Sequence, residues 1–300
     1  MHKFNKFNLQ LFATELVTKF SDAVDELFAQ ESQRAEVTND DYDFTGAHTV
    51  KVYKVTTATM NDYDRSGAGD VEGESFDGFH RYGVPEKLEA TTESLTLTKD
   101  RSFTFVTDRL DEEESGDALE AGKALARQER EVIIPEIDSY TYGVMANNAG
   151  FKPDAVALTA ENIYDEITKG TEALDDALVP ASDRKLIVKP AVYRLLKKCG
   201  DVLDSSDISN EARKRGVVAM LDGMSVIKCP ASRLPQNFGF MIAHPSATVA
   251  PVKLQSYKTH DNPPGVSGYL VEGRIVYDAF VLDNKAEAIY YQAATPAAGA

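Results

Sequence analysis

The sequence is short of cysteine and of long apolar runs, and each shortage excludes a class of protein. Among 300 residues there are only two cysteines, Cys199 and Cys229, without the spacing of a metal site. They are predicted to be buried thiols in a reducing compartment, and a disulfide between them stays open as the alternative. No apolar run approaches the ~18 residues of a membrane span, and "LQLFA" near the start is too short for a signal-peptide core. We therefore expect a soluble protein made in the cytoplasm.

Basic residues are also scarce relative to acidic ones. The chain has 48 acidic and 32 basic residues, which gives a formal net charge of −16. Such a surface repels phosphate backbones, so gripping nucleic acid is not the expected function. The charge suits a protein that lies beside nucleic acid without adhering to it, and it suits ordinary acidic solubility equally well.

The chain lacks the short motifs that carry catalysis or cofactor binding. It has no P-loop, zinc-protease helix motif or nucleophile elbow, and "GAGDVEG" at Gly67–Gly73 fails the dinucleotide spacing. "DYDRSGAGDVEG" from Asp62 approaches a calcium loop, but its twelfth position is Gly73 instead of the bidentate Glu. The histidines have no ligand spacing and no adjacent nucleophile: His2, His48, His80, His244 and His260. We predict no catalytic, cofactor-binding or metal-binding residues, no cofactor and no enzyme activity.

The first hundred residues contain elements with little core of their own. Apolar residues recur every three or four positions from Thr14 to Arg34, which predicts an amphipathic helix that needs a surface to lie on. His48–Thr57 alternates like a strand, Met60–Gly83 is rich in glycine and acidic residues, and Glu93–Asp108 alternates again. The alternating segments favour a long hairpin that rests on something else, and disorder is the alternative.

The stretch "REVIIPEID" at Arg130–Asp138 places a proline inside a helical pattern. The acidic residues Asp111–Glu114 suit the first turn of a helix. Steps of three and four then continue past Pro135 along one face, which consists of Leu119, Gly122, Ala126, Arg130, Ile133, Ile137, Tyr140 and Val144. The pattern predicts one helix of roughly 30 residues, bent at the proline. The alternative is a helix that ends at Ile134 and another that begins with Pro135 in its first turn.

After "NNAGFKPD" the pattern changes to helices and strands in alternation. The expected elements are a helix from Thr159 to about Leu178, a strand in "RKLIVKP", a short helix at Pro190–Gly200, a hairpin turned by Asp222-Gly223, a strand in "FGFMIAHP" and two strands around Asp283-Asn284. The tail "AATPAAGA" is expected to be frayed.

The order of these parts resembles the major capsid proteins of tailed bacteriophages with the Hong Kong 97-type fold, particularly those of Gram-positive hosts. The residues that carry the resemblance are "FNLQLFA" at Phe7–Ala13, "LTKDRSFTFVTDRLDEEES" at Leu97–Ser115, "REVIIPEIDSY" at Arg130–Tyr140 and "MLDGMSVIKCP" at Met220–Pro230. The resemblance covers nearly the whole chain and implies an α+β fold. Its parts would be an N-terminal arm at 1–47, an extended E-loop hairpin with flanking strands at 48–106, a peripheral domain with a long spine helix at 107–153 and 251–292, an axial α/β domain at 154–250 and a frayed tail at 293–300.

The resemblance also implies a function. The chain would self-assemble into an icosahedral or prolate head shell around phage double-stranded DNA, a structural and non-catalytic role in the virion after synthesis in the host cytoplasm. The implied partners are further copies in hexamers and pentamers, a separate scaffolding protein, the portal and decoration proteins, with packaged DNA as a non-specific neighbour and no membrane. The extended loop would reach over a neighbouring copy. The alternatives are an encapsulin-type nanocompartment shell, which shares the fold, and an α/β enzyme with an unrecognised site.

Overall fold

The computed structural model describes residues 32–42, 44, 48–63, 65, 81–82, 86–109, 121–199 and 220–295. The chain divides into two compact units, one made of residues 1–44 and 97–300 and the other of residues 45–96. The predicted helix from Thr14, most of the glycine-rich stretch at 60–83 and the acidic turn at 111–114 lie outside the described residues. Among the described residues, no helix has both the length and the apolar character to cross a membrane.

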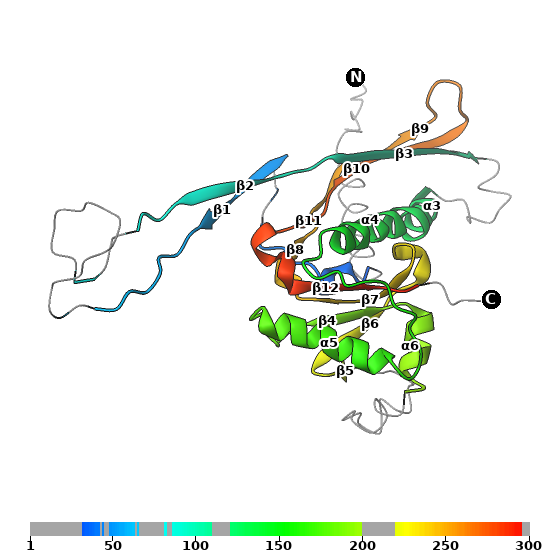
Figure 1. The fold of residues 1–300 in the computed structure, drawn as a ribbon. Helices are drawn as coiled ribbons and strands as arrows, with labels where there is room; N and C mark the ends of the chain where they lie inside the picture. Colours follow the sequence, from blue (N-terminus) through cyan, green and yellow to red (C-terminus); the bar gives the residue numbers. More distant parts are fainter. Residues whose placement is uncertain are drawn as a thin grey trace, which may run out of the picture. The chain divides into compact units, whose positions relative to one another are not determined.

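The unit of residues 45–96 is a two-stranded antiparallel ribbon. Strand β1 (Thr49–Val55) pairs with β2 (Ala90–Thr96) along its whole length, with Thr49 opposite Thr96 and Val55 opposite Ala90 (Figure 1). Beyond the strands, the backbone N–H and hydroxyl of Thr59 donate to the Glu86 carboxylate at 3.0 and 2.5 Å. The predicted pairing of the two alternating segments is therefore confirmed.

The alternating segment Glu93–Asp108, predicted as one strand, is two strands in two different sheets. β2 ends at Thr96, and β3 (Lys99–Asp108) pairs with a strand near the C-terminus. At the change of partner, the Thr98 N–H and hydroxyl donate to Asp278 Oδ2 at 2.7 and 2.8 Å. Alternation continues through this point, so the sequence pattern alone does not show where one sheet ends.

The larger unit contains a three-stranded antiparallel sheet in the order β3–β10–β9, with β9 at Val252–Asp261 and β10 at Gly268–Tyr277. One face of this sheet packs against a long helix (Figure 1). The buried side chains of this contact come from alternate strand positions and from one side of the helix, and they are Leu125, Ile133, Ile137, Tyr257, Val271, Ile275 and Tyr277. Successive side chains of β10 point to opposite faces of the sheet, so its apolar residues at every second position lie on one face.

The long helix passes through Pro135 without interruption. It consists of α3 (Ala121–Gln128), a π-helical turn η2 (Glu129–Ile133) and α4 (Ile134–Asn147). In the π turn, the Ile134 N–H donates to the Glu129 carbonyl five residues earlier. Proline has no N–H, and in an α-helix its ring would clash with the carbonyl four residues before it. The wider turn just before Pro135 accommodates both effects, so the single-helix prediction is confirmed with a π turn at the proline.

The predicted buried face of this helix is wrong before the proline. Leu125 and Glu129 are buried there, whereas Arg130, placed on the buried face by the spacing, is exposed. Ile133 and Ile137 are buried as predicted. A π turn contains one residue more than an α turn and so rotates the later part of the helix by about 100°. The buried residues on either side still follow one another at steps of four, Leu125, Glu129, Ile133 and Ile137. In a uniform α-helix such steps drift by about 40° each around the axis, and the π turn offsets part of that drift.

A five-stranded mixed sheet lies beneath the helix, in the order β12–β7–β4–β6–β5 (Figure 1). Its strands are β4 (Lys185–Val188), β5 (Met220–Leu221), β6 (Met224–Lys228), β7 (Phe238–Ala243) and β12 (Ile289–Ala293). β4 and β6 run parallel, and the other neighbours are antiparallel. The predicted strands in "RKLIVKP" and "FGFMIAHP" are confirmed, as is the Asp222-Gly223 hairpin, where both residues have the positive φ of a type I′ turn.

Helices cover both faces of this sheet. On one face, Ile187 packs with Tyr142 and Met145 of α4. On the other, Leu186 and Val188 pack with the apolar side of α5 (Ile163–Asp176) and with α6 (Pro190–Leu196). Because neighbouring residues of a strand point to opposite faces, the short run "LIV" of β4 joins two separate apolar clusters.

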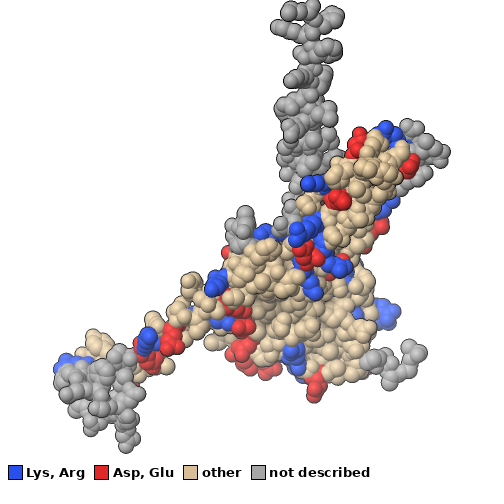
Figure 2. Space-filling view, turned by 90° about the horizontal axis from the view of Figure 1, so that it is seen from above, with Lys and Arg blue, Asp and Glu red and all other residues tan. Residues whose placement is uncertain are grey.

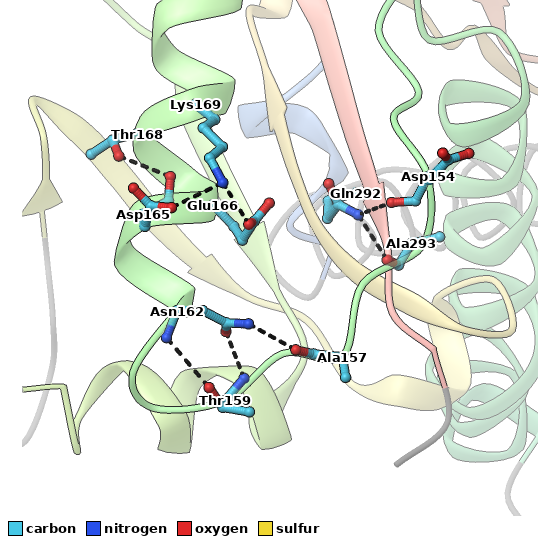
Figure 3. A network of polar contacts seen from close by, with 10 residues as sticks. All are labelled: Asp154, Ala157, Thr159, Asn162, Asp165, Glu166, Thr168, Lys169, Gln292 and Ala293. Atoms are coloured by element: carbon cyan, nitrogen blue, oxygen red, sulfur yellow. Dashed lines mark hydrogen bonds and ion pairs between the residues drawn. The ribbon is translucent and has the colours of Figure 1, made fainter. Parts of the chain in front are cut away.

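Helix α5 begins later than predicted. Thr159 and Asn162 bond each other, with the Thr159 N–H donating to Asn162 Oδ1 at 2.8 Å and the Asn162 N–H donating to Thr159 Oγ1 at 3.3 Å (Figure 3). The Asn162 amide also donates to the Ala157 carbonyl. Residues 160–162 form a turn, and the helix starts at Ile163. Thr159 therefore caps this turn and not the helix itself.

The C-terminal region differs from the prediction in three ways. Asp283–Ala288 is a 3₁₀ helix, η5, instead of a turn between two strands. β12 pairs with β7, so the end of the predicted peripheral segment 251–292 belongs to the same sheet as the predicted axial strands. The frayed tail was expected from residue 293, but Ala293 is in β12, and Ala294 and Thr295 form backbone hydrogen bonds with Asn237 and Val156.

Candidate functional site

No group of three or more His, Cys, Asp or Glu side chains suited to a metal occurs among the described residues. His244 Nδ1 lies 2.8 Å from Ser246 Oγ, and His260 Nε2 lies 3.2 Å from Glu272 Oε2. His48 is exposed, and His2 and His80 lie outside the described residues. Of the near-calcium loop, Asp62 is described, whereas Asp64, Ser66, Gly67, Asp70 and Gly73 are not.

Both cysteines are buried and free, as the sequence predicted. Burial raises the pKa of the Cys229 thiol to about 11, and the negative charge of Asp138 contributes in the same direction. A thiol with such a pKa is almost entirely protonated near neutral pH and is therefore a poor nucleophile.

The ribbon formed by β1 and β2 exposes apolar side chains. Tyr53 and Val55 lie on one face, opposite Thr92 and Ala90, with 73% and 62% of their surfaces exposed. Val50 and Val52, half-buried, lie on the opposite face. Isolated two-stranded ribbons are marginally stable in water, and open strand edges invite pairing. The Tyr53/Val55 face is therefore a candidate interaction surface.

Further apolar side chains are exposed where the ribbon continues beyond its strands. Met60 is almost fully exposed, and Leu88 is exposed by 58%. Tyr63 and Tyr82 pack edge to face with ring centroids 5.0 Å apart, yet both remain exposed. A run of exposed apolar groups along one element is typical of a surface that is covered by a partner.

The end of the N-terminal segment is fastened to the long helix by a buried polar cluster. Ser32 Oγ donates to Asp138 Oδ1 at 2.7 Å, and Arg233 donates to Asp138 Oδ2 at 3.0 Å. Arg34 donates to the Ala250 carbonyl at 3.1 Å. Burial raises the pKa of Asp138, while the hydrogen bond from Ser32 and the charges of Arg233 and Arg34 oppose that shift. Three separate parts of the chain thus meet at one buried carboxylate.

Sequence reasoning missed this cluster. Asp138 ends the stretch "PEID", next to the buried Ile137, and a carboxylate on the apolar side of a helix is the signal that could have been used. The partner residues were not predictable, because Arg233 is 95 residues away in the sequence.

The same segment contributes further contacts to the core. Val37 is fully buried in the cluster with Tyr142 and Met145. The Asn39 N–H donates to the Thr248 carbonyl at 2.9 Å, at the short sheet of β8 (Thr248–Val249) and β11 (Phe280–Val281). Residues 32–39 therefore pack onto the larger unit's core through Ser32, Arg34 and Val37, and residues 1–31 of the expected arm lie outside the described residues.

A second polar junction lies between the long helix and the three-stranded sheet. Tyr140 donates to Asp278 Oδ1 at 2.8 Å, and Tyr277 donates to Glu136 Oε1 at 2.8 Å. Burial raises the pKa of Tyr140 to about 12, and the bond to Asp278 adds to that shift. Two hollows of about 130 and 420 Å³ adjoin this junction and share Arg101, Glu136 and Tyr277. Both tyrosines are protonated and donate hydrogen bonds, so they hold the long helix against the three-stranded sheet.

Charges on the outer face of the three-stranded sheet are arranged in pairs. Arg274 lies 2.5 Å from Asp100, and Arg109 lies 3.1 Å from Asp261. Over this sheet in Figure 2, Lys and Arg atoms lie beside Asp and Glu atoms without a large patch of one sign. Such a surface offers no continuous basic track for a phosphate backbone.

Comparison with known proteins finds a matching protein family and several solved structures with a similar fold. The model of a family described as phage capsid protein matches residues 106–292. The solved structure of Mycobacterium phage Che8 is similar, with 17% identity and a TM-score of 0.69 over 87% of this chain and 90% of that one. Microbacterium phage Oxtober96 matches with 13% identity and a TM-score of 0.59, over 88% and 91% of the two chains. A virus-like particle from Pyrococcus furiosus matches with 14% identity and a TM-score of 0.53, over 92% and 98%. No curated protein sequence matches.

Proposed function

This chain belongs to the phage capsid protein family, and from that premise we propose that its copies bind one another through the β1–β2 ribbon to build a phage head shell. The protein is a major capsid protein with a structural function, and its place is the virion. Its fold is the Hong Kong 97-type capsid fold implied by the sequence resemblance, so that prediction is confirmed. An encapsulin-type compartment is not favoured, because the matching family is a phage capsid family.

The observation that carries the proposed role of the ribbon is its exposed apolar face. Tyr53 and Val55 gain little from folding of a single chain, because most of their surface stays in water. A shell built from identical chains uses contacts between two different surfaces of the chain, repeated until they close. A ribbon that buries its Tyr53/Val55 face on a second copy supplies one such surface.

The assignment of the other segments to capsid domains is also part of the proposal. We propose an arm at 1–47, an extended loop at 48–96, a peripheral domain at 97–153 and 251–288 that includes β3, and an axial domain at 154–250 that also takes in β12. Support comes from the two sheets: the long helix packs on the three-stranded sheet, and α5 and α6 pack on the five-stranded sheet.

The partners beyond further copies follow from the same premise. We propose hexamers and pentamers of the chain, a separate scaffolding protein, a portal and decoration proteins, in a phage of a Gram-positive host whose cytoplasm is the place of synthesis. Packaged DNA would be a non-specific neighbour, which the net charge of −16 supports. We propose no catalytic activity, cofactor or metal site for this chain.

Expression of the chain with and without a scaffolding protein, followed by electron microscopy and light scattering, tests the proposal. Wild-type protein should form shells, capsomers or tubes. The double variant Tyr53→Ser/Val55→Thr should lose assembly while its unfolding transition stays unchanged, because both side chains are exposed in the single chain. The matched control is Val50→Thr/Val52→Thr on the opposite face, which should still assemble. Shells of Tyr53→Ser/Val55→Thr at wild-type concentrations would refute the role of this face.

A further inference from the structure

Leu178 combines two features that are unfavourable in a single chain. Its φ of +57° lies in the left-handed region, and 90% of its surface is exposed. The other non-glycine residues with positive φ in the described part of the chain are Asp183, Asp222, Asn237 and Asn262. Asp and Asn tolerate this conformation, whereas for a bulky residue it is an outlier. Strained residues concentrate at functional sites, and the exposure of this leucine points to a contact outside the single chain.

The left-handed conformation has a local cause. α5 ends at Asp176, the Leu178 N–H donates to the Asp175 carbonyl at 2.9 Å, and the Val179 N–H donates to the Leu174 carbonyl at 3.0 Å. These two bonds define a Schellman motif, in which the residue at the position of Leu178 is usually glycine. Val179 packs against the cluster that contains Leu174, as the motif requires. Glycine would satisfy the backbone better, yet the chain carries leucine.

The loop around Leu178 is held rigidly by a buried arginine. Arg184 Nε donates to the Pro180 carbonyl at 3.0 Å, and one terminal nitrogen donates to the Val179 carbonyl at 2.5 Å and pairs with Asp175 at 2.7 Å. The Arg184 side chain is only 2% exposed. Because the backbone next to Leu178 is already held, little backbone freedom is lost when this residue binds, which favours it as an interface anchor.

Three acidic residues lie close to Leu178 in the sequence. Glu172, Asp176 and Asp183 are exposed and form no ion pair within the described part of the chain. Nearer the start of α5, in contrast, Lys169 lies 2.9 Å from both Asp165 and Glu166 and balances them (Figure 3). The partner of Leu178 should therefore present an apolar surface with basic residues around it.

At the opposite end of β4, the same chain carries a basic surface next to a half-buried aromatic ring. Helix α6 has no acidic residue in its first turn, and Arg194, Lys197 and Lys198 are exposed on it or just after it. Lys197 Nζ and Lys228 Nζ lie 4.9 and 5.5 Å from the centre of the half-buried Tyr193 ring. None of these four cations forms an ion pair within the described residues. We name the group of Tyr193, Arg194, Lys197, Lys198 and Lys228 the α6 patch.

The position of the two surfaces suits contact between copies. Leu178 lies in the connection from α5 to the start of β4, and α6 follows directly after the end of β4 (Figure 1). The two surfaces thus lie at opposite ends of β4 and differ in charge, so they suit head-to-tail association and not contact within one chain. We propose that Leu178 of one copy inserts against the α6 patch of a second copy. This inference rests on the proposed self-assembly and names a contact separate from the ribbon.

Leu178→Gly separates the assembly role from any role in folding. Glycine removes the backbone strain, so the unassembled subunit should unfold about 2 °C higher than wild type. Loss of the leucine side chain from the proposed contact should raise the protein concentration needed for assembly by about tenfold or more. Asn237→Gly is the matched control: it makes the same backbone change at another exposed position with positive φ, and assembly should be unchanged. Assembly of Leu178→Gly at the wild-type concentration would overturn the inference.

Charge reversal identifies the partner surface. Glu172→Lys/Asp176→Lys and Lys197→Glu/Lys198→Glu should each lose assembly, and the chain with all four changes should regain it. No recovery in the fourfold variant would reject the α6 patch as the partner. To distinguish this from failure of the ribbon proposal, sedimentation of Tyr53→Ser/Val55→Thr should show small oligomers that Leu178→Gly removes. A strictly monomeric Tyr53→Ser/Val55→Thr protein would also count against the Leu178 contact.

Discussion

Replacing Asp138 by alanine tests whether the buried polar cluster fastens the N-terminal segment to the long helix. The change removes the acceptor of two hydrogen bonds, at 2.7 Å from Ser32 and 3.0 Å from Arg233. It also leaves the Arg233 side chain, 19% exposed, without its carboxylate, and it removes a negative charge that acts on the buried Arg34. Removal of one partner from a buried ion pair typically costs 3–5 kcal/mol, and we expect about 3 kcal/mol because Arg233 keeps some contact with water. That is a large part of the 5–15 kcal/mol by which a typical domain is stable.

The measurement is guanidinium denaturation of unassembled subunits near pH 7, followed by circular dichroism. Asp100→Ala is the matched control, since it breaks an Arg–Asp pair of similar geometry whose side chains are about half exposed. Exposed pairs contribute little to stability, so the control should unfold close to wild type. Equal destabilisation by the two variants would refute the reasoning. Proteolysis should also cut Asp138→Ala near residues 32–39 more readily than the control.

Three further predictions concern other parts of the molecule. Gly143→Ala should stabilise the subunit by about 0.5–1 kcal/mol, since an added Cβ meets nothing within 4 Å. Gly150→Ala should instead destabilise it by about 1–3 kcal/mol, because its Cβ would lie 2.6 Å from the Glu287 backbone. Thermal unfolding of both variants checks this pair of predictions. Cys229 should react with a thiol reagent at about pH 8 only on unfolding, because its pKa is about 11 and it is buried; fast labelling of the folded subunit would contradict this. Burial raises the pKa of Asp138, so the folded protein binds a proton on this carboxylate more tightly than the unfolded chain does. The contribution of Asp138 to the free energy of unfolding therefore falls as the pH rises through its folded pKa. The free energy of unfolding of wild type minus that of Asp138→Asn should therefore be larger near pH 4 than near pH 8, and the opposite trend would contradict it.

Local patterns predicted most of the elements in the second half of the chain. The strand of "RKLIVKP", the Asp222-Gly223 hairpin and the helix with proline at its first turn, Pro190, all depend on residues close together in the sequence. The burial of both cysteines was likewise predictable from their residue type and the lack of any metal spacing. These predictions succeed because turn chemistry, proline geometry and apolar runs act over a few residues.

Other features depend on contacts between distant residues. The run Glu93–Asp108 alternates throughout, and only the pairing of β2 with β1 and of β3 with β10 divides it into two strands. The π turn before Pro135 is a local response to the proline, but its effect on burial was visible only once the helix was packed on the sheet. The change of strand partner leaves no mark in the residue pattern, because the alternation continues across it.

The sequence by itself determined the order of the parts, the acidic surface and the resemblance to a capsid subunit, because each is a property of composition or of short motifs. Only the tertiary structure decided that Asp138 binds residues from two distant parts of the chain, Ser32 and Arg233. Only the tertiary structure likewise decided that Leu178 has a positive φ and an exposed side chain. The physical reason is that burial and backbone strain depend on which distant residues come together, and a linear pattern does not contain that information.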